Sequence, residues 1–395
     1  MKIKQSQRVQ RVKPSPTLAV TARAAELKAA GQDIIGLGVG EPDFNTPDHV
    51  KEAAIKAIQN NETRYTAVDG TAALKQAIID KFHRDNKLDY QPNQILVSSG
   101  GKQSFYNLCQ AMLDAGDEVL IPAPYWVSYP DMVLLADATP VIVLAGKDQH
   151  FKLTAEQLEK NLSDKTRLLV LNSPSNPTGV AYSRAELTEL AVVLRKHPDI
   201  LIATDDMYEH IYWQQEPFCN ILMVAPDLYD RTIVLNGVSK AYAMTGWRIG
   251  YAAGPADLIK NMKKIQSQST SNPASISQAA ALEALQGDQS YIQTMLKAFK
   301  ERHDYLVDAL NQLPGFSCMP GDGTFYAFPD VSEAIASIDG IHDDLEFSEY
   351  LLNNAGVAIV PGSAFGAPGY IRLSFATSMD VLHDAVARIA RALYQ

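Results

Sequence analysis

Lys240 lies in an unusually apolar stretch, "NGVSKAYAMTGWRIGY" (236–251), among glycine, small and aromatic residues, and Arg248 follows eight positions later. Removing an ammonium group from water lowers its pKa, so a lysine in such a setting becomes a nucleophilic amine suited to forming a Schiff base. Arg248 adds a planar guanidinium that suits a phosphate oxyanion. An isolated lysine is more often a surface residue with its charged end in water, so the neighbouring residues decide between the two interpretations.

A carboxylate completes this set of groups. Asp205 opens the stretch "DDMYEHIYW", which follows another apolar run. A lysine that captures an aldehyde, an arginine that clamps a phosphate and a lone buried acid together describe a site for pyridoxal phosphate. In such a site the acid holds a protonated ring nitrogen and makes the ring an electron sink.

The elements that position these groups are short β-branched runs that end in turn residues. Each run has the length of a buried parallel strand, and helical patterns such as "SRAELTELAVVLRK", with a capping box from Ser183 to Glu186, separate several of them. This alternation predicts an open α/β sheet wound on both faces, with ligands bound beyond the carboxyl ends of the strands. The runs span 94–101, 117–124, 139–146, 166–179, 199–206 and 231–240.

Chain length points to two domains, because 395 residues exceed the roughly 250–300 that a single core supports. The predicted division is an N-terminal arm and part of a small domain in 1–48, a large cofactor-binding domain in 49–299, and the rest of the small domain in 300–395. We expect helices at about 16–30, from Pro47, across 273–312 and from about 378, and C-terminal strands at "GTFYAFP" and "YIRLSFA".

Composition narrows the class of protein. With 46% hydrophobic and 20% charged residues the chain resembles an ordinary globular protein. A net charge of -10 argues against nucleic acid as a partner, and no apolar run reaches the roughly eighteen residues of a membrane span. We expect a cytoplasmic location, with a mitochondrial leader as the minor alternative. Three cysteines without CxxC spacing indicate neither a disulfide framework nor a metal site.

Six motifs taken together resemble the fold-type I, class I aminotransferases, in particular the bacterial aspartate aminotransferase subgroup. The matches run in family order from about residue 11 to 377. The resemblance implies a large domain with a mostly parallel seven-stranded sheet flanked by helices, a smaller α+β domain from both termini, and pyridoxal 5'-phosphate as cofactor. The motifs are "LGVGEPDF", "PAPYWVSYP", "NSPSNPTG", "DDMYEHIYW", "NGVSKAYAMTGWRIGY" and "YIRLSFATS".

The resemblance also assigns roles around the cofactor. Lys240 matches the lysine that forms the Schiff base and then moves the substrate proton, Asp205 matches the acid on the ring nitrogen, and Tyr208 matches the phenol at the ring 3-hydroxyl. These three are the predicted catalytic residues. The other expected cofactor contacts are ring stacking by Trp126, an amide at the ring oxygen from Asn176, phosphate contacts from Gly101, Lys102 and Arg248, and a phosphate contact from Tyr65 of a neighbouring subunit.

Substrate contacts follow from the same resemblance. Arg372 matches the arginine that grips the α-carboxylate, and Gly40 matches a glycine whose backbone meets the substrate. Lys102 is associated with the distal carboxylate of acidic substrates, although it could equally be a solvated cation at a helix start. Lys13 lies where the N-terminal segment can close over the site. Trp126 and Asn176 are expected to touch the substrate as well.

The predicted activity is reversible, ping-pong transfer of the amino group between L-aspartate and 2-oxoglutarate by a homodimer with shared sites. The alternative is an aromatic or prephenate aminotransferase, or an enzyme with dual specificity. A related enzyme that performs β-elimination or ring closure, and a non-catalytic binding protein, are further alternatives. The segment "QSQSTSNPASISQ" resembles one near the dimer interface. Two departures from the family pattern are Asp206, where glutamate is common, and Gly237, where some relatives have a hydroxyl residue on the phosphate.

Overall fold

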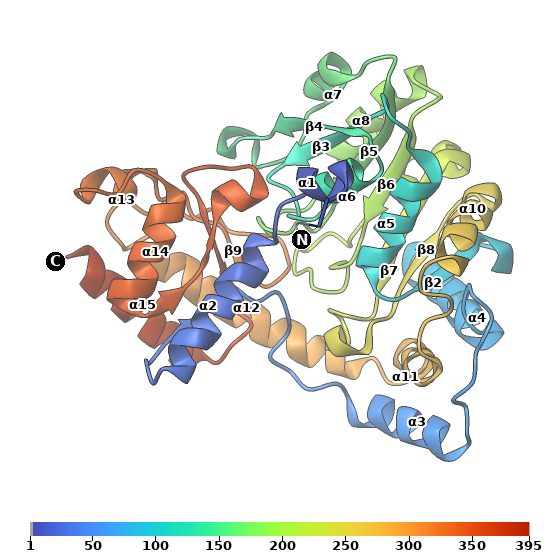
Figure 1. Cartoon of the computed structure of the whole chain (residues 1–395), viewed down its shortest axis with the longest axis horizontal. Coiled ribbons are helices and arrows are strands. Elements are labelled where there is room, and N and C mark those ends of the chain that lie inside the picture. Colours follow the sequence, from blue (N-terminus) through green and yellow to red (C-terminus); the bar gives the residue numbers. More distant parts are fainter. Residues whose placement is uncertain (1–2, 395) are drawn as a thin grey trace.

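A seven-stranded sheet forms the centre of the larger part of the molecule, as seen in a computed structural model that describes residues 3–394 (Figure 1). β8 runs antiparallel to both of its neighbours, and the other pairings are parallel, so β2 points the same way as the parallel strands. The carboxyl ends of six strands therefore face one rim. In sheet order the strands are β2 (Ile95–Ser98), β8 (Gly250–Ala253), β7 (Thr232–Gly237), β6 (Leu201–Asp205), β5 (Thr166–Asn172), β3 (Glu118–Ala123) and β4 (Thr139–Leu144).

Helices cover both faces of this sheet because successive strand residues point to opposite sides. Ile95 and Val97 of β2 belong to one apolar cluster, whereas Leu96 belongs to the other. The first cluster includes side chains from α3 (Asp48–Gln59), α4 (Ala72–Lys81), α7 (Ala155–Asn161), α8 (Arg184–Lys196), α9 (Ile221–Val224) and α11 (Ser275–Gln286). The second includes side chains from α5 (Gly101–Met112), α6 (Tyr129–Leu135) and α10 (Ala256–Ser267).

The smaller part joins the two ends of the chain, at the left of Figure 1. β1 (Ile35–Gly36) pairs in parallel with β10 (Val357–Ala358), and β12 (Ile371–Ser374) lies between β11 (Val360–Pro361) and β9 (Tyr326–Ala327). The helix α12 (Ser290–Leu310) extends from the larger part into this region (Figure 1). The remaining helices are α1 (Gln7–Arg11), α2 (Pro16–Ala29), α13 (Ser332–Ser337), α14 (Asp344–Ala355) and α15 (Met379–Leu393).

Local expectations are largely met, with small differences at element ends. The capping box at Ser183 is present, and all three cysteines are free and buried. Pro47 is the N-cap residue of α3 and not, as predicted, its first helical residue. The region 273–312 forms two helices, and the first ends at the C-cap residue Gly287. β8 is a strand that none of the six predicted runs included. Across residues 3–394, none of the helices combines the length and apolarity needed to cross a membrane.

Candidate active site

The polar ends of β2, β5, β6 and β7 meet at a cavity of about 300 Å³ between the large sheet and the smaller part of the chain. Ligands bind at this rim in open α/β sheets. Ten of the twelve predicted site residues line the cavity, and they come from segments that are hundreds of positions apart in the sequence. These ten are Gly40, Gly101, Lys102, Trp126, Asn176, Asp205, Tyr208, Lys240, Arg248 and Arg372.

Lys240 follows the end of β7 and reaches the cavity wall. Its Nζ donates a hydrogen bond to the carbonyl oxygen of Gly40 at 2.5 Å. Burial, and after it the positive charge of Arg372, lowers the pKa of Lys240 to about 8. A substantial fraction of this amine is therefore neutral near physiological pH, as a nucleophile or base requires.

Asp205 ends β6, and its carboxylate is held by two donors. The Tyr129 hydroxyl donates to Oδ2 at 2.5 Å, and the Met207 backbone N–H donates to Oδ1 at 3.2 Å. Burial raises the pKa of Asp205, an effect that these hydrogen bonds oppose. Burial also raises the pKa of Tyr208, so its phenol stays protonated and can donate a hydrogen bond to a ligand oxygen.

Close backbone approaches shape the part of the cavity at the start of α5. Gly100 has φ +93°, and a Cβ there would lie 2.2 Å from a guanidinium nitrogen of Arg248. Gly250 lies so close to the start of α5 that a Cβ at position 250 would lie 2.2 Å from the Gly101 backbone nitrogen. Arg248 itself has φ +57°, a backbone conformation that is costly for a non-glycine residue and often marks a functional site. The free N–H groups of a helix start and a guanidinium form a seat for an anion.

Arg372 lies at the opposite side of the site, on β12. Its guanidinium donates to Asn176 Oδ1 at 2.9 Å and to the Gly38 carbonyl at 2.7 Å. The residue is 2% exposed. Among residues 3–394 its Nε has no hydrogen-bond partner. A buried guanidinium with an unused donor and no carboxylate beside it is costly unless an anion arrives. The arrangement suits a carboxylate ligand.

Two predicted site residues lie outside the cavity. Tyr65 is 93% exposed, so within a single chain it contacts no part of the site. Lys13 lines a neighbouring cavity of about 540 Å³, which shares Lys102 and Arg248 with the first, and its backbone N–H donates to Asp131 at 3.4 Å.

The two departures from the family pattern have structural explanations. Asp206 does not line the cavity, and it accepts hydrogen bonds from Thr204 and Asn220. An aspartate in place of the glutamate common in the family therefore changes no group that lines the cavity. Gly237 pairs with Gly250 in the sheet, and a Cβ at position 237 would lie 3.0 Å from the Ile249 carbonyl oxygen. A side chain there would require this backbone to move.

Several residues of the site were not predicted from the sequence, and three of them contact predicted site residues. The Tyr326 hydroxyl lies beside that of Tyr208, the Tyr129 hydroxyl donates to Asp205, and the Gly38 carbonyl accepts from Arg372. Each lies within a motif quoted above or within the predicted strand "GTFYAFP". The motifs could therefore have indicated the neighbourhood, but only the folded chain shows which side chain turns toward the site.

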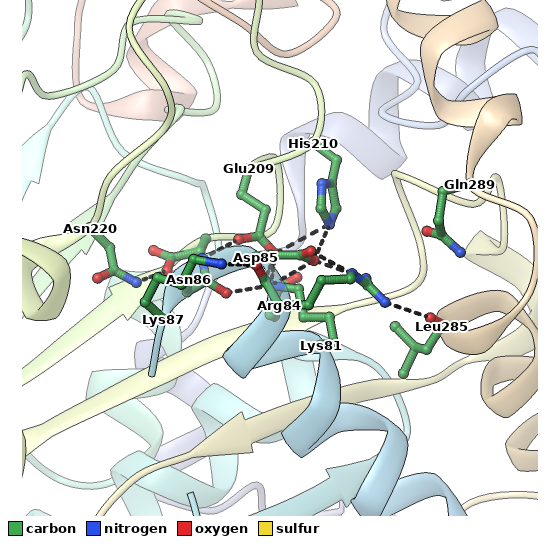
Figure 2. A network of polar contacts seen from close by, with 12 residues as sticks. Lys81, Arg84, Asp85, Asn86, Lys87, Glu209, His210, Asn220, Leu285 and Gln289 are labelled. Carbon is green, nitrogen blue, oxygen red and sulfur yellow. Dashed lines mark hydrogen bonds and ion pairs between the residues drawn. The ribbon is translucent and has the colours of Figure 1, made fainter. Parts of the chain in front are cut away.

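Figure 2 shows a second polar cluster, which includes the buried residues Lys81, Asn86 and Glu209. Glu209, one residue after Tyr208, pairs with Lys81 and accepts hydrogen bonds from Asn86 and Asn236. Lys81 is 1% exposed, and its Nζ also donates to Asn86 at 2.8 Å. The cluster fastens the segment 205–210 to the end of α4 and to β7 just before Lys240.

The residues of the cavity fit pyridoxal phosphate. Lys240 offers a partly neutral amine for the aldehyde, Asp205 a carboxylate for the ring nitrogen, and Tyr208 a protonated phenol for the ring oxygen. Arg248 and the start of α5 offer a seat for the phosphate. The unused Nε of Arg372 leaves a separate place for a carboxylate. Fold and site together define a fold-type I enzyme that uses pyridoxal phosphate.

Comparisons with known proteins specify the family. Residues 32–389 match the model of aminotransferase class I and II. An aspartate/prephenate aminotransferase of Nitrosomonas europaea is 61% identical, over 99% of this chain and 100% of the relative. An aspartate aminotransferase of Rhizobium meliloti has a TM-score of 0.96 and 46% identity over 100% of this chain and 99% of that one. The aspartate aminotransferase of Thermus thermophilus with maleate has a TM-score of 0.93 and 42% sequence identity, over 99% of this chain and 100% of that one.

The chain therefore belongs to the class I and II aminotransferases. It is an α/β protein of fold type I and a pyridoxal phosphate-dependent aminotransferase. The family that the sequence motifs resemble is thus confirmed.

Proposed function

We propose that this enzyme transfers the amino group reversibly between L-aspartate and 2-oxoglutarate, and that it also accepts prephenate. The observation that carries the first part is that Lys102 lines the cavity together with Arg372. Lys102 Nζ lies 5.1 Å from the centre of the Trp126 ring, and Arg372 lines the same cavity. A dicarboxylic substrate can place its α-carboxylate on Arg372 and its distal carboxylate on Lys102. The names of the relatives agree with this substrate class.

Each residue contributes one physical step. When bound, pyridoxal phosphate supplies an aldehyde that takes up amino groups and a ring that absorbs electrons. Arg372 grips the substrate α-carboxylate and so orients the Cα–H bond toward Lys240. The Lys240 amine, partly neutral because of its pKa near 8, would take the proton from Cα and deliver it to the cofactor carbon that carried the aldehyde. The Gly40 carbonyl holds this amine at the cavity wall in the meantime.

The residues at the cofactor end hold charge in place. Asp205 would keep the ring nitrogen protonated, and Tyr129 and the Met207 backbone fix the direction of its carboxylate. Tyr208 would donate to the ring oxygen, Trp126 would cover the ring face, and Arg248 and the start of α5 would hold the phosphate. These assignments of roles are part of the proposal.

The neighbouring cavity supports prephenate as a further substrate. It has a volume of about 540 Å³ and shares Lys102 and Arg248 with the first cavity. Lys13, on the segment after α1, lines it. A substrate larger than aspartate, with a ring and a second carboxylate, has room to extend past Lys102 toward Lys13.

The variant Lys102→Met tests whether Lys102 binds the distal carboxylate. Amination of oxaloacetate, prephenate and phenylpyruvate would be compared in wild type and variant. Loss of a charge-assisted contact of about 1.5–3 kcal/mol predicts that kcat/KM falls about tenfold to 150-fold for oxaloacetate. Phenylpyruvate, which has no second carboxylate, should change little. An equal loss for oxaloacetate and phenylpyruvate would remove Lys102 from substrate recognition.

The working unit in this proposal is a homodimer in which Tyr65 of one subunit contacts the phosphate in the other. Tyr65 is 93% exposed, and Ile55 and Ile58 on α3 are more than half exposed, so an apolar surface is available for a partner.

The domain boundaries near residues 48 and 299, and a cytoplasmic location, stay predictions from the sequence.

Mixed dimers test the shared site. Each variant would first be assayed alone at low cofactor concentration. The Lys240→Ala homodimer should be inactive, and the Tyr65→Ala homodimer should have reduced activity. In a mixed dimer, one site combines an intact Lys240 with an intact Tyr65 from the other chain, so mixing should restore activity at that site. Failure of mixing to restore any activity, in a sample shown to contain mixed dimers, would contradict the shared site.

A further inference from the structure

Tyr326 connects the two ends of the site. It lies on β9 opposite Ser374 of β12, is 1% exposed, and lines the cavity. Its hydroxyl oxygen lies 2.9 Å from the hydroxyl oxygen of Tyr208. Its ring centre lies 4.3 Å from Cζ of Arg372. One side chain thus touches the expected partner of the cofactor and the expected partner of the substrate.

The ring of Tyr326 restricts the guanidinium of Arg372. Phe365 lies near the same group, with its ring centre 4.9 Å from Cζ, so Arg372 is in contact with two aromatic rings. Such contacts attract a guanidinium and limit its orientation. With Asn176 and the Gly38 carbonyl already bonded, the rings help to keep the remaining donors aimed at an incoming carboxylate.

The hydroxyl of Tyr326 contacts Tyr208, the expected partner of the cofactor ring oxygen. Either hydroxyl can be the donor in the hydrogen bond between the two tyrosines. When the phenol of Tyr208 donates its proton to the ring oxygen, Tyr326 is left as the donor. Donation into the Tyr208 oxygen polarises that phenol and strengthens its own donation. Gly40 makes this arrangement possible, because a Cβ at position 40 would lie 2.6 Å from the Tyr326 hydroxyl. The same glycine carbonyl holds Lys240.

We propose that Tyr326 is a positioning residue for the reaction: its ring orients Arg372 toward the substrate carboxylate, and its hydroxyl tunes the Tyr208 phenol toward the cofactor. The inference rests on the proposed function, because it assumes that Arg372 binds a carboxylate and that Tyr208 binds the ring oxygen. The two actions belong to different atoms of one side chain, so two substitutions separate them.

The experiment uses the holoenzyme and two readouts other than turnover. The first is the pH midpoint of the visible absorbance of the bound cofactor, with Tyr208→Phe as reference. Tyr326→Phe keeps the ring and should shift this midpoint in the same direction as Tyr208→Phe by about 0.3–1 pH unit, the size expected for one neutral hydrogen bond. The second is the affinity for maleate, a dicarboxylate that is not turned over, which Tyr326→Phe should leave within about twofold.

Tyr326→Leu removes the ring as well and should weaken maleate binding about fivefold to 30-fold, the effect of about 1–2 kcal/mol of lost guanidinium contact. Phe365→Leu is the matched control, because it removes a ring from Arg372 but no hydroxyl. It should weaken maleate binding and leave the absorbance midpoint unchanged.

Two results would overturn the proposal: a midpoint in Tyr326→Phe equal to that of wild type, or a shift in Phe365→Leu as large as in Tyr326→Phe. If Tyr326→Leu does not fold, the comparison of Tyr326→Phe with Phe365→Leu still decides. Failure of the wild-type holoenzyme to bind maleate would instead contradict the proposed substrate class.

Discussion

Lys81 and Lys240 are two inward-facing lysines in the larger part of the molecule, and they differ in what surrounds them. Lys81 is paired with Glu209 and bonded to Asn86 (Figure 2). Lys240 is bonded only to the Gly40 carbonyl, and within residues 3–394 no carboxylate lies within ion-pair distance of it. The first arrangement is complete without a ligand, and the second is not. Charge that is neutralised internally serves the fold, whereas charge left unpaired is available to a ligand.

The same contrast extends to the other cations of the cavity. In the part of the chain that the structure describes, Lys102, Arg248 and Arg372 also lie beyond ion-pair distance of any carboxylate. A protein with a net charge of -10 has many acids with which it could pair them. Their isolation leaves the cavity locally positive, as a site for a phosphate and two carboxylates needs to be.

The largest expected effect comes from Lys240→Ala. Removing the group that moves the proton away from Cα should lower the rate of amino-group transfer from aspartate by about 10⁴-fold or more. The free energy of unfolding of the cofactor-free protein should not fall, because an unpaired cation is lost. Single-turnover rates and urea unfolding measure the two quantities. A rate within tenfold of wild type would make Lys240 dispensable.

Lys81→Met should have the opposite profile. It leaves Glu209 buried without its cation, so the free energy of unfolding should fall by about 3–5 kcal/mol. Adding Glu209→Gln should recover part of this loss, because the uncompensated charge disappears. The control is Lys300→Met, which breaks an exposed pair with Asp304 and should cost under about 1 kcal/mol. If Lys81→Met costs no more than this control in urea unfolding, the comparison of the two lysines fails.

Arg372→Lys tests the carboxylate seat. Lysine keeps the positive charge but loses the planar fork, so kcat/KM for aspartate should fall about 10²- to 10³-fold. Binding of the cofactor should be unchanged, since Arg372 lies at the substrate end. Steady-state kinetics and titration with pyridoxal phosphate measure these two outcomes. Equal losses in both would mean that the substitution disturbs the whole site.

The smallest effect is a dependence of stability on pH. Lys240 has a pKa of about 8 in the folded protein against an ordinary value of 10.5, so the unfolded chain binds more protons between these values. Folding is penalised fully below about pH 8, and the penalty disappears as the pH rises to about 10.5. The cofactor-free protein should gain at most about 3 kcal/mol over this range relative to Lys240→Met. Parallel pH profiles for the two proteins would show that the pKa of Lys240 is not lowered.

The sequence predicted the parts of this account that depend on local pattern. Asp205 and Lys240 follow apolar runs directly, and the alternation of strands and helices brings such ends to one rim. β8 was missed because "GYAA" is short and begins with glycine, which is a weak strand signal. Its pairing between β2 and β7 comes from the tertiary structure.

Long-range contacts account for what the sequence could not show. Lys81 and Glu209 are 128 positions apart, and each taken alone resembles an ordinary solvated charge. Tyr326 belongs to a strand of two residues, and its contacts with Tyr208 and Arg372 join segments on either side of the site. No local pattern indicates which of the tyrosines turns inward.

The most direct test of the central claim, that the unpaired cations serve amino-group transfer from a dicarboxylic amino acid, is the half-reaction. Holoenzyme would be mixed with L-aspartate in the absence of any keto acid, and the oxaloacetate formed would be counted per subunit. The account predicts one equivalent, together with loss of the visible absorbance of the cofactor and its return when 2-oxoglutarate is added. Continuous release of ammonia or pyruvate, or no oxaloacetate at all, would contradict it.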